Sequence, residues 1–180
     1  MLEASRPSAN PKGGRTVKPV VISPESAENA VGLVIAEEVR VGGKRAFHKG
    51  HRIAAGDIVT VAKLDAPVHA VRLDADDVHE DDAAIELANL IAGEGLEIRK
   101  PVQSRVNLYS ARRGLLRIDI DAIVDLNMID GIAIFTHIDR LPVNPGQNVA
   151  GAKVTPISVP RPVLDRAREL VATLDGPIVT

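Results

Sequence analysis

A chain of 180 residues with only three aromatic side chains must build its core from aliphatic ones. The three are Phe47, Tyr109 and Phe135, and Trp is absent. Hydrophobic residues still make up 45% of the chain, so Val, Ile, Leu and Ala must fill the interior. Proteins that bind single-stranded nucleic acid stack bases on aromatic rings. We therefore expect no nucleic-acid partner.

The net charge and the absence of cysteine exclude further classes of function. The net charge is -2, which gives no overall field that would attract a polyanion. Cys is absent, which excludes disulfides, thiolate catalysis and cysteine-ligated metals. The apolar runs are too short for a membrane-spanning helix. We expect a cytoplasmic protein that has no membrane partner.

The first half of the chain mixes helix and strand signals. Residues 1–16 lack an apolar stretch and are typical of a disordered tail. Ser23 and Pro24 indicate a short helix start, and Gly42-Gly43 indicates a hairpin turn. A longer helix is predicted, capped by Asp76 or Asp77 and ending at Gly93. Strands are predicted at residues 20–22, 33–41, 44–48 and 68–73, with a helical face over 55–64.

The second half is richer in strands. A short helix follows Asp119 or Asp121, and Pro160 opens a last amphipathic helix. The predicted strands are residues 96–98, 102–109, 115–120, 132–138 and 148–159. The fold class is therefore α+β. A mixed small domain of helices and a hairpin, residues 17–93, is followed by a mostly β domain, residues 94–180, barrel or clip-like and closed by a C-terminal helix.

An acidic group at the start of the longest predicted helix is the most conspicuous polar feature. It comprises Asp74, Asp76, Asp77, Glu80, Asp81 and Asp82, with His79 inside it. Carboxylates at a helix N-terminus accept its free N–H groups and complement its dipole. The alternative is a divalent cation site formed by His79, Glu80 and Asp81, since hard cations prefer carboxylate oxygens.

A basic group precedes it in the sequence. It comprises Lys44, Arg45, His48, Lys49, His51 and Arg52, on either side of the predicted turn at Gly50. Such a group can bind a phosphate or another anion, with Lys49 and His51 as the candidate ligands. The alternative is a solvated hairpin edge, where charges discourage the addition of another strand.

Polar residues inside strand-like runs form a third candidate set. Asn107 lies between Val106 and Leu108, and Lys153 lies in the run 148–159. Such an Asn either ties down a turn backbone or faces a ligand. No nucleophile elbow, P-loop or dinucleotide-binding motif is present, so the sequence carries no catalytic signature.

Five segments in the same order resemble prokaryotic molybdopterin-binding proteins related to the molybdopterin molybdotransferase (molybdenum insertase) family. Together they span roughly residues 25–168. They are KGHRIAAGDI (49–58), DVHEDDAAIELANLIA (77–92), RVNLYSARRGLLRI (105–118), IVDLN (123–127) and VNPGQNVAGAKVTP (143–156).

This resemblance implies an accessory module in molybdenum cofactor biosynthesis or handling. It corresponds to the family's leading region and lacks the separate pterin-holding domain. The implied ligand is molybdopterin or molybdate, with Lys49, His51, Asn107 and Lys153 meeting the phosphate or oxyanion. The acidic residues would hold Mg²⁺ or cap the helix. The family also implies pairing into a homodimer. Two alternatives remain: a purely structural or dimerisation module, and a small β-clip enzyme acting on an acidic sugar-acid substrate.

Overall fold

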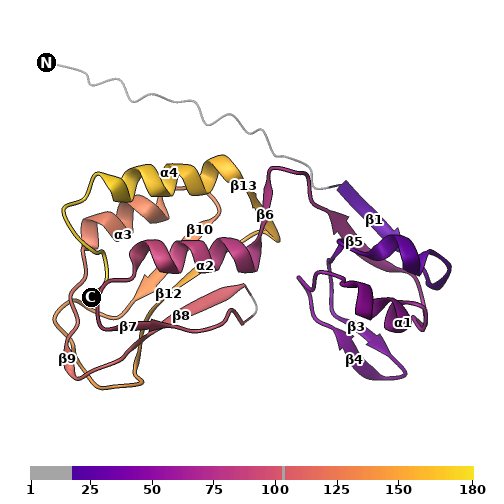
Figure 1. Ribbon diagram of the computed structural model, residues 1–180, viewed down its shortest axis with the longest axis horizontal. Coiled ribbons are helices and arrows are strands. Elements are labelled where there is room, and N and C mark those ends of the chain that lie inside the picture. Colours follow the sequence, from indigo (N-terminus) through magenta and orange to yellow (C-terminus); the bar gives the residue numbers. More distant parts are fainter. Residues whose placement is uncertain (1–17, 103) are drawn as a thin grey trace, which may run out of the picture.

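The computed structural model describes residues 18–102 and 104–180, which form two lobes (Figure 1). The predicted disordered tail, residues 1–16, lies outside the described residues. The α+β class and the C-terminal helix are confirmed. The two lobes meet around a short two-stranded sheet made by β6 (Asp77–His79) and β13 (Ser158–Pro160).

The first lobe contains a three-stranded antiparallel sheet of order β1-β5-β2, and a hairpin. The hairpin turns at Gly42 and Gly43, both with positive φ, as the sequence predicts. The elements of this lobe are β1 (Lys18–Ile22), η1 (Pro24–Ala30), β2 (Val34–Ile35), β3 (Val39–Val41), β4 (Lys44–Phe47), η2 (Ala55–Asp57), α1 (Ile58–Val61) and β5 (Val68–Arg72).

The second lobe is a four-stranded antiparallel sheet of order β10-β12-β8-β7 with helices packed on one side of it (Figure 1). A small sheet pairs β9 with β11. The elements are α2 (Glu80–Ile91), β7 (Leu96–Ile98), β8 (Arg105–Ser110), β9 (Gly114–Leu115), α3 (Ile120–Asn127), β10 (Ile132–Thr136), β11 (Pro142–Val143), β12 (Asn148–Val154) and α4 (Arg161–Ala172).

Of the two predicted forms of this lobe, barrel or clip-like, the closed barrel is wrong. β10 and β7 are the two edges of the sheet and do not pair with each other, so the sheet stays open. The helices supply the second layer that a closed barrel would otherwise provide. α2 packs on β8 and β12, α3 packs on β10, and α4 packs on α2.

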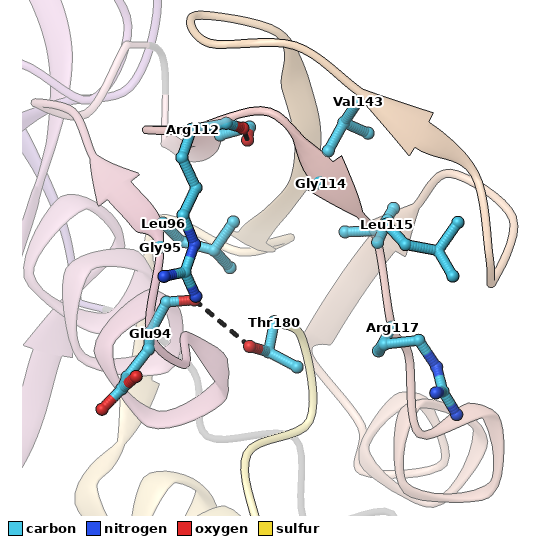
Figure 2. Close-up of a pocket in the computed structure, with 11 residues that line it drawn as sticks. Glu94, Gly95, Leu96, Arg112, Gly114, Leu115, Arg117, Val143 and Thr180 are labelled. Carbon is cyan, nitrogen blue, oxygen red and sulfur yellow. Dashed lines mark hydrogen bonds between the residues drawn. The ribbon is translucent and has the colours of Figure 1, made fainter.

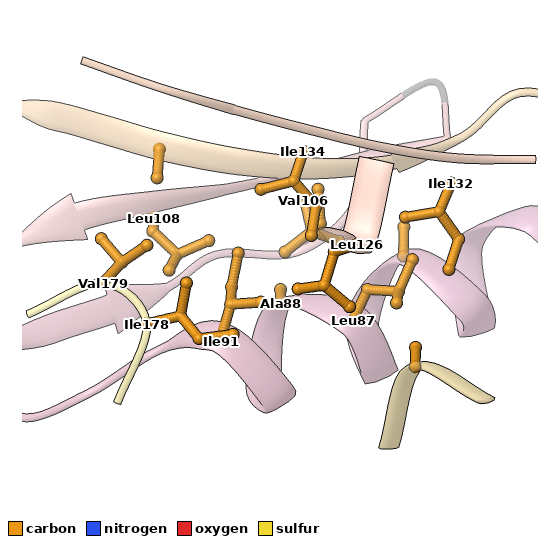
Figure 3. Close-up of a cluster of buried hydrophobic side chains, with 14 of the residues drawn as sticks. Leu87, Ala88, Ile91, Val106, Leu108, Leu126, Ile132, Ile134, Ile178 and Val179 are labelled. Atoms are coloured by element: carbon orange, nitrogen blue, oxygen red, sulfur yellow. The ribbon is translucent and has the colours of Figure 1, made fainter. Parts of the chain in front are cut away.

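Two separate aliphatic cores hold the lobes. The smaller one centres on Ile22, Ile35, Ile53 and Val61, each at most 1% exposed. The larger one brings Leu87 and Ile91 of α2 against the buried side of the sheet (Figure 3). The sequence places the joint between halves at residues 93–95. The buried side chains of α2 belong to the larger core, that of the second lobe. The boundary between the two cores therefore lies before α2 in the sequence.

Several predicted element limits differ from the structure. Residues 77–79 are extended because they pair with Ser158–Pro160, so α2 begins after His79 and neither Asp76 nor Asp77 caps it. The run 33–41 is divided into β2 and β3. Where one helix is predicted over residues 55–64, the structure has a 3-10 turn, η2, followed directly by a short α-helix, α1. Asp119 caps α3 as predicted, and its carboxylate accepts the Ala122 N–H at 3.0 Å.

Within residues 18–102 and 104–180, every helix is too short or too polar to cross a lipid bilayer.

Candidate functional site

The basic segment and the start of α2 meet where the two lobes join. His79 caps α2, and its Nδ1 accepts the Asp81 N–H at 3.2 Å. The proton is therefore on Nε2, which donates to the Gly50 carbonyl at 2.8 Å. His79 is only 4% exposed, so this ring connects the two lobes from a buried position.

Gly50 makes room for the neighbouring acidic side chain. Its φ is +84°, and a Cβ at this position would collide with Glu80 Oε1 and lie 3.2 Å from Glu80 Cδ. The Glu80 carboxyl thus occupies space that any other residue at position 50 would fill. Glu80 itself is 8% exposed.

Burial raises the pKa of the Glu80 carboxyl, and the charge of Asp81 raises it further. A hydrogen bond with Ser104 and the nearby charge of Lys49 act in the opposite direction, but the pKa stays above its usual value. The folded protein therefore disfavours ionisation of Glu80 relative to a solvent-exposed glutamate.

We expect Glu80→Gln to stabilise the protein at neutral pH. A raised folded-state pKa means that the carboxyl contributes most to stability below its unfolded pKa, and that this contribution is lost as the pH rises through the folded value. Gln keeps an acceptor for Ser104 and carries no charge. Thermal unfolding of both proteins at several pH values should show the advantage of the variant shrinking toward pH 4. An advantage that does not depend on pH would contradict the assignment.

A hollow of about 260 Å³ opens at this lobe junction. Two of its basic side chains are already paired: Arg52 Nη2 lies 3.0 Å from Asp82 Oδ2, and His51 Nε2 lies 2.8 Å from Asp57 Oδ2. A backbone hydrogen bond from Ala54 and the contact with His51 hold the pKa of Asp57 below its usual value. The lining residues are His48, Gly50, His51, Arg52, His79, Asp81 and Asp82.

The arrangement gives no support to the predicted metal set of His79, Glu80 and Asp81. Both ring nitrogens of His79 are used in hydrogen bonds, and Asp81 Oδ1 accepts the Ser104 N–H at 3.2 Å. In the described ranges, no three His, Cys, Asp or Glu side chains come close enough to hold an ion.

The second candidate site is the side of the four-stranded sheet that the helices leave uncovered. Along β8, Val106 and Leu108 are buried toward the helices, so Arg105, Asn107 and Tyr109 point the opposite way. Residues directly opposite each other in the register share a face. Arg105 is therefore beside Lys153, Asn107 is beside Gly151, and Gly151 is beside Phe135. We call this surface the open sheet face. It comprises Arg99, Arg105, Asn107, Tyr109, Phe135, Gly151 and Lys153.

An arginine guanidinium lies over each of the two aromatic rings on the open sheet face. The Arg99 guanidinium carbon lies 3.6 Å from the centre of the Tyr109 ring. The Arg105 guanidinium carbon lies 5.0 Å from the centre of the Phe135 ring. Over the part of the chain that the structure describes, Arg99, Arg105 and Lys153 form no salt bridge. Their charges remain available to an anion.

The structure thus divides the predicted ligand residues between two places. His51 lines the hollow at the lobe junction and Lys49 lies close enough for its charge to act on Glu80 there, whereas Asn107 and Lys153 lie on the open sheet face. The sequence did not identify the arginines and aromatic rings beside the second pair as site residues. The alternation in RVNLYS, residues 105–110, is the signal that could have found Arg105 and Tyr109, since every second residue is polar or aromatic.

A smaller hollow of about 180 Å³ lies at the far end of the sheet (Figure 2). The Arg112 side chain lies against Gly95, where a Cβ would be 2.7 Å from its Nε. The Thr180 hydroxyl donates to the Glu94 carbonyl at 3.2 Å (Figure 2). None of the predicted site residues lines this hollow.

Comparisons of the chain with known protein families, with curated proteins and with solved structures give no significant match.

Proposed function

We propose that this chain is a binding module for molybdopterin, acting as an accessory part in molybdenum cofactor biosynthesis or handling in the cytoplasm. The resemblance of five collinear segments supplies the ligand class. One observation carries the choice of site. Arg99 and Arg105 lie over two of the chain's three aromatic side chains, and Lys153 is opposite Arg105, on the face of the sheet that the helices of the described residues leave open.

The chemistry of this face fits a phosphorylated pterin. A terminal phosphate is a dianion, and Arg and Lys donors form the strong charge-assisted hydrogen bonds that it requires. A pterin ring is flat and polar at its edge, and it can stack on an aromatic ring or on a guanidinium plane. The chain's net charge of -2 makes this local excess of positive charge more distinctive.

The proposal assigns no catalytic step to the chain and does not use Mg²⁺. In the resembled family the reaction needs a further pterin-holding domain, so the residues of the open sheet face would bind and orient the ligand. The acidic residues of α2 stabilise the fold and do not bind the ligand. Asp82 forms a salt bridge with Arg52, and the Asp81 carboxylate accepts the Ser104 N–H.

The direct test is a calorimetric titration with a pterin that carries a terminal phosphate. We expect Arg105→Ala and Lys153→Ala each to weaken binding about fivefold, which corresponds to roughly 1 kcal/mol for one exposed charge-assisted contact. Lys63→Ala, an exposed lysine of the first lobe, is the matched control and should leave the affinity unchanged.

Lys49→Ala tests whether the ligand binds at the lobe junction or on the open sheet face. If this variant loses affinity while Lys153→Ala does not, the ligand binds at the lobe junction and the choice of the open sheet face is wrong. Inorganic phosphate and molybdate, titrated alone, show which part of the ligand each cation contacts. A short single-stranded oligonucleotide that binds more tightly than the phosphorylated pterin would also overturn the proposal, since sheets with stacked rings bind nucleic acids too.

Pairing of two copies stays a prediction. One described surface that a second copy could cover is a side of α3 and its C-cap, where Ile120, Val124 and Met128 are 60%, 54% and 79% exposed. Their spacing of four residues places them in one row along the helix.

A further inference from the structure

The centre of the open sheet face is built from three residues in register across three strands. Phe135 of β10 is opposite Gly151 of β12, which is opposite Asn107 of β8. A Cβ on Gly151 would lie 2.6 Å from Phe135 Cε2 and 3.0 Å from Asn107 Oδ1. The Phe135 ring therefore leans across β12 toward Asn107 and fills the space of the missing side chain.

Asn107 has a buried polar atom that is unpaired among the described residues. Its Oδ1 is buried and has no hydrogen-bond partner within residues 18–102 and 104–180. A buried carbonyl oxygen without a donor is unfavourable, because it has lost water and gained nothing in return. An unpaired atom of this kind in a folded protein calls for an explanation, and a donor supplied by a bound ligand is one.

The ring beside this oxygen is placed so that it can move. Phe135 is on β10, an edge strand, and it is 38% exposed although it is one of the largest side chains in the protein. It belongs to neither aliphatic core. Rotation of its side chain outward would therefore disturb no core packing, and it would release Arg105 from its position over the ring.

We propose that Phe135 is a plug over a slot whose floor is Gly151, and that the flat ring of the ligand replaces it there. An N–H on the edge of the ligand ring then donates to Asn107 Oδ1. Arg105 and Lys153, side by side on β8 and β12, take the phosphate. This inference rests on the proposed function and adds how the ring part of the ligand is recognised. The ligand class is a flat heterocycle with an N–H donor on its edge and a phosphate attached.

The experiment uses two probes that each carry half of the ligand. The pterin alcohol 6-hydroxymethylpterin reports on the slot through its fluorescence, and inorganic phosphate reports on the cations through calorimetry. We expect Phe135→Ala to bind the pterin at least fivefold more tightly than the natural chain, since no ring has to be displaced. We expect Asn107→Leu to bind it at least tenfold more weakly. Asn107→Leu should leave the affinity for phosphate unchanged, because its side chain takes no part in binding the phosphate.

Two controls keep the result interpretable. Asn89→Leu, on the exposed side of α2, introduces the same side chain away from the sheet and should have no effect on either probe. Phe135→Leu retains part of the ring volume and should fall between the natural chain and Phe135→Ala. If Phe135→Ala does not fold, Phe135→Leu and Asn107→Leu still decide the outcome.

The direction of the Phe135 effect is decisive. Weaker pterin binding by Phe135→Ala would show that the ligand stacks on this ring, which overturns the plug. Unchanged pterin binding by Asn107→Leu would overturn the role of its carbonyl oxygen. Either result, combined with phosphate binding that depends on Arg105 and Lys153, leaves the proposed function standing. Absence of binding by both probes to the natural chain removes the proposed function and the plug together.

Discussion

Replacing Gly50 with alanine is expected to lower the free energy of unfolding by about 3 kcal/mol. Two causes combine at this position. The φ of +84° is unfavourable for a residue with a Cβ, which accounts for about 1–2 kcal/mol. The new methyl group would also displace the Glu80 carboxyl from a buried place where it is hydrogen-bonded to Ser104. Chemical denaturation measures the sum.

Two further variants separate these causes. Gly32 has nearly the same φ, +85°, and a Cβ there would meet nothing within 4 Å, so Gly32→Ala should show the backbone cost alone. In a Glu80→Ala background, Gly50→Ala should likewise cost only about 1–2 kcal/mol, because the collision is gone. Equal effects of Gly50→Ala and Gly32→Ala in the natural chain would mean that Glu80 does not pack against Gly50.

Leu87→Ala is expected to cost about 3 kcal/mol, within the range of 2–5 kcal/mol for emptying a buried leucine site. Leu87 is 1% exposed and lies between α2 and the sheet, near Val106 and Leu126 (Figure 3). Its loss leaves a cavity under the strands that form the open sheet face. Ile85→Ala on the same helix is the control, since Ile85 is 37% exposed and should cost far less.

The separate cores make this prediction specific to one lobe. Leu87 belongs to the larger cluster, and the smaller cluster around Ile35 and Val61 shares no residue with it. Hydrogen exchange of Leu87→Ala should therefore accelerate more in β8 and β12 than in β5. Equal acceleration in β5 would show that the lobes unfold as one cooperative unit.

Local signals in the sequence were sufficient for most of the elements. Gly42-Gly43 marks a hairpin because two successive positive φ values favour glycine, and Asp119 marks a helix start because its carboxylate can accept a free N–H. Both signals depend on neighbouring residues only. The structure agrees with them to within a residue or two.

The sequence could not predict what depends on distant pairing. Residues 77–79 look like the first turn of an acidic helix, but Val78 is paired with Val159 and keeps them extended. The same pairing makes His79 the cap of α2 and turns it toward Gly50. No local pattern connects residues so far apart in the chain.

The candidate site was predictable only in part, for the same reason. Asn107 and Lys153 stand out as polar residues inside strand-like runs, and the structure places both on the open sheet face. Arg99 and Phe135 do not stand out, because their neighbours on this face come from other strands. The absence of a side chain at Gly151 matters only once Phe135 and Asn107 are known to lie on either side of it.

Amide chemical shifts, recorded by NMR while a phosphorylated pterin is titrated into the full chain, test the central claim most directly. Binding on the open sheet face predicts saturable shifts at Arg99, Arg105, Asn107, Tyr109, Gly151 and Lys153, with little change at residues 48–52 and 79–82. Shifts confined to those two segments, or no saturable shift at all, would contradict it.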